Sequence, residues 1–205
     1  MFKRNQNGQF MENVFSAPEF EFLYDNVPWV GTEKVDGTNI RIHPYQHPES
    51  EELAVEIAGR TDNAHIPEFL LKELHKIFTP ESFEDVFTDY SSEIILYGEG
   101  YGNRIQKVGK SYIPDGVSFV LFDIQINGIF LKQDDVLAIA TALKIDVVPR
   151  VYVGTLKEAV ETVRKGFRSM WGDFLAEGLV LTPEVALLDR MGRRIITKVK
   201  TRDFR

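Results

Sequence analysis

The sequence of 205 residues predicts an α+β fold built mostly on antiparallel sheets flanked by helices. Strand-like runs outnumber helical ones, and the two kinds do not alternate regularly, as they would in a parallel, doubly wound sheet. No internal repeat, low-complexity tract or linker rich in Pro, Gly or Ser divides the chain. We therefore expect a single domain over residues 1–205.

Six runs rich in β-branched and aromatic residues predict strands. In chain order they are Val30–Ile42, Leu53–Gly59, Glu93–Gly98, Ser118–Ile126, Gly178–Thr182 and Arg194–Lys200. The last run carries Lys198 and Lys200 two positions apart, so a strand places both ammonium groups on one face. Like charges on one face repel unless an anion lies between them, and a triphosphate is such an anion.

Three stretches have apolar residues at helical spacing. They are Pro67–Phe78, Gln133–Leu143 and Thr155–Met170. Pro67 suits the first turn of a helix. Asp134 and Asp135 lie in the first turn of the second stretch, where they favour the helix dipole. Thr155 and Glu158 form a capping box that marks the start of the third.

The composition indicates an intracellular, cytoplasmic protein with no membrane partner. The chain has no cysteine, which excludes disulfides, thiolate nucleophiles and cysteine-ligated zinc. Its first residues lack the apolar core of a signal peptide. No apolar run approaches the length of about 20 residues that spans a bilayer.

The charge is unevenly distributed along the chain. A net charge of −7 argues mildly against nucleic-acid binding. Residues 186–205, however, hold seven basic and two acidic residues, a net +5, which leaves −12 for the preceding 185 residues. A solvated tail is one explanation. The apolar residues interleaved with these charges favour a strand with one buried face.

The run Glu33–Asn39 places Lys34 just before a tight turn that contains Asp36 and Gly37. A lysine held there can attack a nucleotide α-phosphate, provided that its neighbours favour the neutral amine. The alternative is a charged hairpin turn, because Asp-Gly before β-branched residues is a strong hairpin signal. Asp36 and Asn39 can hold either turn through side-chain to backbone hydrogen bonds.

Further charged residues lie where predicted strands end. Arg60 can pair with phosphate oxygens, and Glu99 lies among glycines that let a ligand approach the backbone closely. Asp123 stands within an apolar strand, where a carboxylate needs a partner or a metal. Glu177 heads another apolar strand. Phe122 is most simply a core residue when it is considered alone.

The order of these segments resembles the motif set of the covalent lysine nucleotidyltransferases, and above all the RNA ligase 2 family. The likeness rests on Glu33-Lys34 and Asn39 around the turn, Arg60-Thr61, Glu99 with the downstream Ile105-Gln106-Lys107, Phe122-Asp123-Ile124, Glu177-Gly178 and Lys198-Val199-Lys200. It runs from about Gly31 to Phe204. The resemblance implies the fold of a nucleotidyltransferase (adenylation) domain.

The resemblance also implies roles for individual residues. Lys34 is the expected adenylated nucleophile, and Lys198 and Lys200 are expected to contact phosphate. Phe122 is expected to stack on adenine, which reverses its simplest interpretation. The remaining expected nucleotide contacts are Glu33, Asp36, Asn39, Arg60, Glu99 and Glu177, and Glu99 and Glu177 are also the expected metal ligands.

The implied activity is that of an ATP-dependent RNA ligase that uses Mg²⁺ or Mn²⁺ and seals 5′-phosphate to 3′-hydroxyl RNA ends. Members of this superfamily generally carry another domain after the K-x-K motif, whereas this sequence stops five residues after Lys200. We therefore expect no C-terminal oligonucleotide-binding or helical domain, and RNA binding by a basic rim or a partner protein. A DNA ligase, a capping-type guanylyltransferase and a non-catalytic nucleic-acid-binding module remain alternatives.

Overall fold

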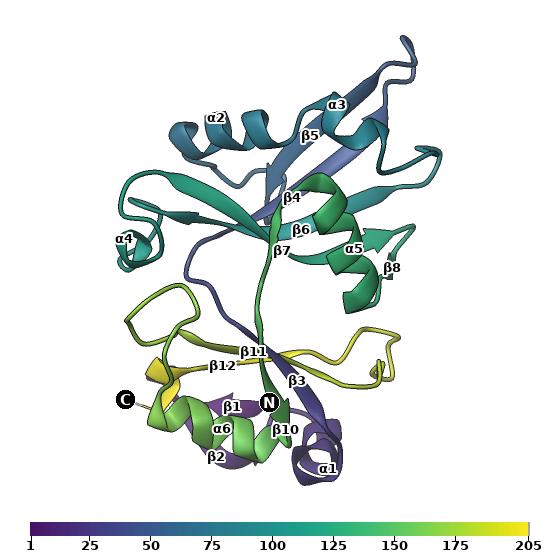
Figure 1. Cartoon of the computed structure of the whole chain (residues 1–205). Helices are drawn as coiled ribbons and strands as arrows, with labels where there is room; N and C mark the ends of the chain where they lie inside the picture. Colours follow the sequence, from purple (N-terminus) through teal and green to yellow (C-terminus); the bar gives the residue numbers. More distant parts are fainter. Residues whose placement is uncertain (205) are drawn as a thin grey trace. The chain divides into compact units, whose positions relative to one another are not determined.

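The computed structural model describes residues 1–204 and confirms the α+β prediction. Its sheets are antiparallel except for one short parallel pairing, and six α-helices accompany them. The contacts divide the chain into two compact units (Figure 1). Unit 1 combines Met1–Val35 with the segment from Pro149 onward, and unit 2 is the continuous segment Asp36–Val148. The expectation of a single domain stays a prediction.

Unit 1 contains a four-stranded antiparallel sheet whose strands lie in the spatial order β10, β3, β11, β12. Their bounds are Arg150–Gly154, Trp29–Glu33, Gly178–Pro183 and Thr197–Lys200. A separate hairpin, β1 (Phe2–Arg4) and β2 (Phe10–Phe15), precedes the sheet in the sequence. The helices are α1 (Pro18–Asn26), α6 (Leu156–Lys165) and the 3₁₀ turn η1 (Thr201–Phe204).

One face of the unit 1 sheet is buried under α6, α1 and the hairpin. Val160 and Val163 of α6 share a core cluster with Leu179, Leu181 and Val199 of the sheet. Because side chains alternate along a strand, the residues between these core positions face the other side of the sheet. Lys198 and Lys200 both lie on that other side. The sequence predicted that the two lysines share one face of their strand.

Unit 2 contains a larger sheet in the order β5, β4, β6, β7, β8, with β9 parallel to β7. Their bounds are Leu53–Gly59, Thr38–Gln46, Ile94–Gly102, Val117–Ile126, Ile129–Phe130 and Asp146–Val147. The helices are α2 (Glu68–Ile77), α3 (Pro80–Glu84), α4 (Gly109–Tyr112) and α5 (Gln133–Leu143).

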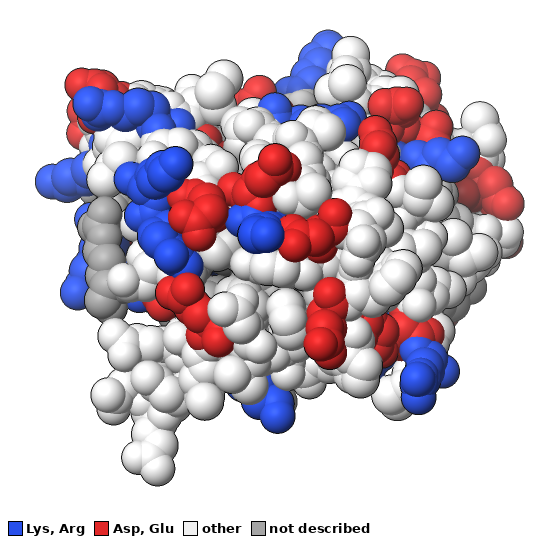
Figure 2. Space-filling view, turned by 90° about the horizontal axis from the view of Figure 1, so that it is seen from below, with Lys and Arg blue, Asp and Glu red and all other residues white. Residues whose placement is uncertain are grey.

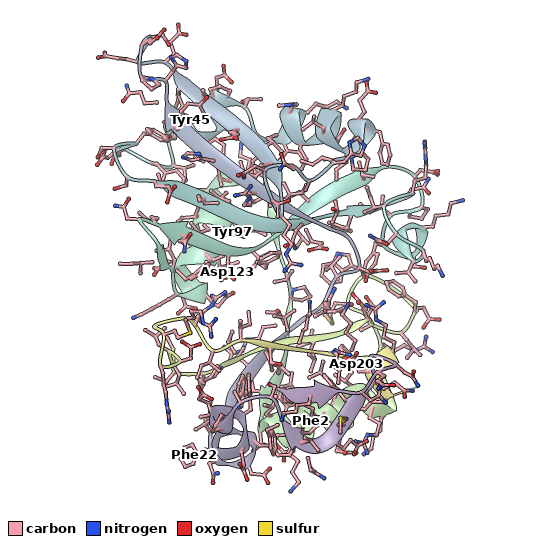
Figure 3. The ribbon with its side chains drawn as sticks, turned by 180° about the vertical axis from the view of Figure 1, so that it is seen from behind. Phe2, Phe22, Tyr45, Tyr97, Asp123 and Asp203 are labelled. Atoms are coloured by element: carbon pink, nitrogen blue, oxygen red, sulfur yellow. The ribbon has the colours of Figure 1, made fainter. Side chains whose placement is uncertain are left out.

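The core of unit 2 lies between α2, α3 and α5 and one face of this sheet. Leu70 and Leu74 of α2 and Ala140 of α5 are fully buried there, together with Ile40 and Leu96 of the strands. The opposite face of the sheet carries polar and aromatic side chains. Tyr45, Tyr97 and Asp123 are labelled on it in Figure 3.

Two predicted elements differ from the structure in a way that bears on the site. The run Val30–Ile42 was expected as one strand, but it forms β3 and β4, which belong to different sheets. Since β3 and β4 do not pair, the hairpin interpretation of the turn after Lys34 is also wrong. The helix expected over Thr155–Met170 ends at Lys165, because Gly166 takes a positive φ of 80°.

Other boundaries agree more closely. The capping box of Thr155 and Glu158 is present at the start of α6, and Pro67 lies at the N-cap of α2. The final strand begins at Thr197 rather than at Arg194. The N-terminal hairpin and α1 were not predicted. None of the helices within residues 1–204 combines the length and the apolar character needed to cross a membrane.

Candidate functional site

The predicted nucleophile, Lys34, belongs to a small ionic cluster in unit 1 that is centred on Glu177. Its Nζ is 2.5 Å from Oε2 of Glu177, and the other oxygen of that carboxylate, Oε1, is 2.7 Å from Nζ of Lys200. The side chains of Lys34, Glu177 and Lys200 are 16 %, 14 % and 12 % exposed. One carboxylate therefore holds two ammonium groups in a largely desolvated setting, where charge-assisted hydrogen bonds are strong.

The strand register explains why these three residues meet. Lys34 directly follows β3, and its backbone N–H donates to the carbonyl of Gly178 over 2.9 Å. Gly178 in turn pairs with Lys200 across β11 and β12. Glu177 immediately precedes β11, so the nucleophile, the carboxylate and the lysine come from three neighbouring strand ends. The Lys34 ammonium also donates to the carbonyl of Val35 over 3.0 Å.

Lys198 lies on the same face of β12 as Lys200, between the buried Thr197 and Val199. Its side chain is exposed, whereas that of Lys200 is largely covered. The prediction that both lysines share a face is therefore confirmed.

Glu33 points to the opposite side of β3 from Lys34. It is 1 % exposed, and its Oε2 accepts a hydrogen bond of 2.8 Å from the backbone N–H of Met170. Oε1 has no hydrogen-bond partner among the residues that the structure describes. Burial raises the pKa of Glu33, and the bonds from Met170 and Ser169 offset only part of that effect. The geometry makes Glu33 a support for the segment that leads to Glu177.

In unit 2, the turn that follows Lys34 in the sequence is anchored to β6, to α4 and to the segment before α4. The backbone N–H of Asp36 donates to the hydroxyl of Tyr112, and the Gln106 side chain donates to the carbonyl of Gly37. A Cβ at Gly37 would lie 2.6 Å from Cγ of Glu99. The turn therefore requires glycine at this position, because β6 approaches it closely.

Asn39 and Glu99 face each other across β4 and β6. They are direct register partners, and Nδ2 of Asn39 donates to Oε2 of Glu99 over 2.9 Å. Both residues were predicted from the sequence as nucleotide contacts. The structure brings this pair together on the face of the sheet that the helices leave open.

Phe122 occupies a β-bulge. Tyr97 pairs with Asp123 and Gly98 pairs with Leu121, so Phe122 has no residue opposite it. Its backbone carbonyl instead accepts a hydrogen bond from the Gln133 side chain. The extra residue switches the alternation of β7, so that both Phe119 and Ile124 belong to the core. Phe122 itself is half-buried and lies outside both core clusters.

The bulge therefore removes Phe122 from the core and exposes part of its ring, as bulges beside active sites commonly do. Asp123 follows directly and pairs with Tyr97, and both are labelled in Figure 3. Asp123 is only 7 % exposed. The simplest interpretation of Phe122, a core residue, is wrong for this reason.

Arg60 is the predicted site residue with the least support from its surroundings. It follows β5 in an exposed position. Its side chain makes no hydrogen bond or ion pair with the described part of the chain. Asp62 nearby is instead paired with Arg41 over 2.6 Å. Arg60 is available to an anion, but no neighbouring side chain fixes its position.

The predicted metal ligands, Glu99 and Glu177, belong to different units. Within residues 1–204 no group of three or more His, Asp or Glu side chains is arranged to hold a metal ion. Either carboxylate taken by itself has donor chemistry that fits Mg²⁺ or Mn²⁺ on a nucleotide, because such an ion can use a single protein carboxylate and complete its shell with phosphates and water.

Two contributions to the candidate site were not predicted. Tyr112 anchors the turn through Asp36 but belongs to a four-residue helix with no clear sequence pattern. Arg4 and Arg202 line a groove with Lys198 and Lys200. The basic segment at residues 186–205 indicated part of this charge, whereas nothing in the sequence placed Arg4 beside it.

Comparisons with known proteins bear on the family and the fold of this chain. The profile of the RNA ligase family matches residues 27–200. No curated protein matches the sequence significantly.

Among solved structures, a Naegleria gruberi RNA ligase mutant with ATP and Mn is similar at a TM-score of 0.66 and 16 % identity, over 91 % of this chain and 53 % of that one. The same ligase with PPi gives a TM-score of 0.65 and 17 % identity, again over 91 % and 53 %. This chain thus spans about half the length of the ligases that it resembles. At this identity the likeness supports the fold, and it confirms the predicted nucleotidyltransferase architecture.

Proposed function

Because this chain belongs to the RNA ligase family, we propose that it is an ATP-dependent RNA ligase in which Lys34 takes up AMP. One observation carries the proposal: Lys34 Nζ lies 2.5 Å from a carboxylate that also holds Lys200. A positioned lysine beside a proton acceptor and further cations is the arrangement that nucleophilic attack on a nucleotide phosphate needs.

In the first step, the Lys34 amine attacks the α-phosphorus of ATP. A nitrogen–phosphorus bond forms, the bond from that phosphorus to the bridging oxygen breaks, and pyrophosphate leaves. Oε2 of Glu177 is within reach of the proton that Lys34 gives up. Lys198 and Lys200 stabilise the charge that develops on the leaving phosphates. A bound Mg²⁺ or Mn²⁺ would supply further neutralisation of the phosphate charge. Glu177 is the carboxylate that unit 1 would offer to such an ion, and Glu99 is the one that unit 2 would offer.

For unit 2, we propose that Phe122, Asn39 and Glu99 contact the nucleotide. The half-buried ring of Phe122 offers an apolar surface on which a purine can stack. Glu99 and Asn39 offer a carboxylate and an amide that are already held in one orientation by their mutual hydrogen bond. Asp36 holds the turn, Arg60 offers an exposed guanidinium to phosphate, and Glu33 acts through the segment that contains Met170.

The second and third steps transfer AMP and seal the RNA. The 5′-phosphate of an RNA end attacks the adenylate phosphorus, so that the bond to Lys34 breaks and a phosphate anhydride forms. A 3′-hydroxyl then attacks the 5′-phosphate, AMP leaves with the bonding electrons, and the hydroxyl proton passes to solvent. Catalysis by this chain is mainly positioning and charge stabilisation, as in other phosphoryl transfers.

Sealing of a nicked RNA duplex tests the proposal. The protein, ATP and Mn²⁺ or Mg²⁺ are incubated with a nick that carries a 5′-phosphate, and a second reaction contains a pre-adenylated nick without ATP. We expect both nicks to be joined. Joining of the pre-adenylated nick alone would show that the first or the second step fails, and would contradict ATP-dependent ligation by this chain. Two further reactions test the alternatives: the protein is incubated with labelled ATP or labelled GTP, and with a nicked DNA duplex. Transfer of label to the protein from GTP but not from ATP would indicate a guanylyltransferase. Joining of the DNA nick alone would indicate a DNA ligase. No labelling and no joining would leave a binding module.

A further inference from the structure

Unit 1 contains a basic groove, and only part of its lining has a role in the steps proposed above. It has a volume of about 520 Å³, and its lining includes Lys198 and Lys200 of β12, Arg202 of η1 and Arg4 of β1. The lining continues along the turn of the N-terminal hairpin through Asn7 and Gln9. Arg4, Asn7, Gln9 and Arg202 all lie outside residues 27–200, the part that matches the RNA ligase family.

The groove is positive although the chain as a whole is negative. Four cationic side chains line it against one carboxylate, that of Asp203, whereas the net charge of the chain is −7. Figure 2 shows Lys and Arg side chains gathered toward the left of its view, the side on which the C-terminal segment lies in Figure 1. A local concentration of one sign of charge in a groove attracts ligands of the opposite sign.

Arg4 is held in place at the edge of the groove. Its guanidinium pairs with Oδ1 of Asp203 at 2.8 Å, donates to the carbonyl of Gly8, and lies 4.4 Å above the ring of Phe10. Asp203 is almost fully buried, and its second oxygen accepts from the backbone N–H of Lys200. Figure 3 shows Asp203 beside the strands of the hairpin that carries Phe2. The hairpin and β12 are thus joined through one carboxylate.

Arg202, unlike Arg4, is not held in place by neighbouring side chains of the described residues. It is exposed, and its side chain makes no hydrogen bond or ion pair with residues 1–204. The Asn7 side chain is likewise exposed and makes no such contact within the described chain. Fixed cations, a free guanidinium and an amide along one groove match the oxygens of successive phosphates, since guanidinium groups bind phosphate in a bidentate manner.

We propose that this groove binds the phosphate backbone of an RNA strand. The inference rests on the proposed function, which makes RNA the substrate. Lys198 and Lys200 already account for the phosphates of one nucleotide. Arg4, Arg202 and Asn7 extend the groove beyond them toward the hairpin, as a ligand with further phosphates requires. The groove would recognise phosphate groups, which an RNA backbone shares with two other ligands. Those alternative ligands are the triphosphate of ATP and pyrophosphate.

The test compares Arg202→Ala with Arg190→Ala in the full chain. Both arginines are exposed in unit 1 and neither has a side-chain partner within residues 1–204, but only Arg202 lines the groove. The probe is a labelled, 5′-phosphorylated single-stranded RNA, whose binding is followed by fluorescence anisotropy over a series of salt concentrations. The apparent KM for ATP in self-adenylation, and inhibition by pyrophosphate, are measured on the same variants.

We expect Arg202→Ala to weaken RNA binding roughly fivefold and to reduce the slope of log K against log salt by about 0.7, the value for one phosphate contact to a single strand. Arg190→Ala should bind as the unaltered chain does, Arg202→Lys should keep the slope, and the KM for ATP should stay the same. A double variant, Arg4→Ala with Arg202→Ala, should reduce the slope by about 1.4.

Two outcomes would overturn the proposal. In the first, Arg202→Ala and Arg190→Ala bind RNA equally well. In the second, Arg202→Ala raises the KM for ATP or weakens pyrophosphate inhibition while RNA binding is retained, which assigns the groove to nucleotide phosphates. If no lysyl-AMP forms in the unaltered chain but the RNA slopes still differ, the groove proposal is supported and the first-step proposal fails. The two proposals can thus be separated.

Discussion

At the scale of single residues, the candidate nucleophile is defined by what its ammonium group touches. Glu177 accepts from Lys34 with one oxygen and from Lys200 with the other. The sequence predicted all three residues as parts of a site through the resemblance, and the shared face of Lys198 and Lys200 through strand alternation. It could not predict that Glu177 bridges two lysines, because this depends on the register of β11 with both β3 and β12.

Replacing Glu177 with Gln tests this bridge. The amide keeps the shape of the side chain but removes the charge that holds two ammonium groups, so we expect a free energy of unfolding lower by about 1–3 kcal/mol. Loss of the proton acceptor should slow self-adenylation by roughly 100-fold or more. Thermal denaturation and single-turnover labelling with ATP measure the two effects.

The matched control for that change is Glu184→Gln. Glu184 is exposed in the same unit, and its side chain has no partner within the described residues. It should leave both stability and labelling within error of the unaltered chain. If Glu177→Gln behaved like this control, the carboxylate would have no part in the first step.

Glu33 provides a prediction about pH. Burial raises its pKa above the ordinary value of 4.5, so the folded state binds a proton more tightly than the unfolded state does. Below about pH 4.5 both states are protonated and Glu33 carries no penalty. As the pH rises through the raised pKa, the buried carboxyl must ionise and stability falls. Glu33→Gln should therefore raise the Tm relative to the unaltered chain at pH 8, and less so at pH 4.5.

Thermal scans across this pH range measure the effect, with the exposed Glu21→Gln of α1 as control. A difference in Tm between Glu33→Gln and the unaltered chain that does not grow with pH would contradict the assignment of a raised pKa to Glu33.

At the scale of secondary-structure elements, β7 shows where sequence patterns succeed and where they fail. The run Ser118–Ile126 predicts the strand, and the structure places it at Val117–Ile126. Strict alternation would put Phe119, Leu121 and Asp123 on one face. The bulge at Phe122 prevents this, so that Ile124 rather than Asp123 joins the core. A bulge has little signature in a single sequence, because it depends on the partner strand, here on Gly98.

The two phenylalanines of β7 should respond differently to truncation. Phe119 is a core residue whose ring packs edge-on against that of Phe78, with 5.0 Å between the ring centroids. Phe119→Ala should therefore lower the free energy of unfolding by about 3–5 kcal/mol. Phe122 lies outside the core, so Phe122→Ala should cost less than about 1 kcal/mol. It should nonetheless weaken nucleotide binding by about 1–3 kcal/mol if the ring stacks on adenine.

Chemical denaturation and ATP titration distinguish the two variants. Equal losses of stability would mean that the bulge does not take Phe122 out of the core. Unchanged ATP binding in a stable Phe122→Ala variant would remove its role in stacking.

At the scale of the whole molecule, the chain forms two units, one continuous and one assembled from both ends of the sequence. The sequence suggested one domain, since no composition change marks the positions where the chain passes from one unit to the other. Those crossings lie at Val35–Asp36 and Val148–Pro149. The first falls one residue after Lys34, in the run that was expected to continue as one strand.

Unit 2 has its own core and is a single stretch of chain, so we expect residues 36–148 to fold when expressed alone. Circular dichroism and a cooperative denaturant transition would show this, with Phe119→Ala in the same fragment as a destabilised control. Residues 149–204 alone should stay unfolded, because β3, the central partner of β10 and β11, comes from the N-terminal segment. A fragment 36–148 without a cooperative transition would contradict this division.

The most direct test of the account is to measure whether the chain takes up AMP and on which residue. The protein is incubated with ATP and Mn²⁺ or Mg²⁺, its intact mass is measured, and the modified residue is located by peptide mapping. We predict one AMP per chain on Lys34, no AMP on Lys34→Ala, and normal uptake by Lys165→Ala, an exposed lysine at the end of α6. AMP on another residue, or AMP still bound to Lys34→Ala, would contradict Lys34 as the nucleophile.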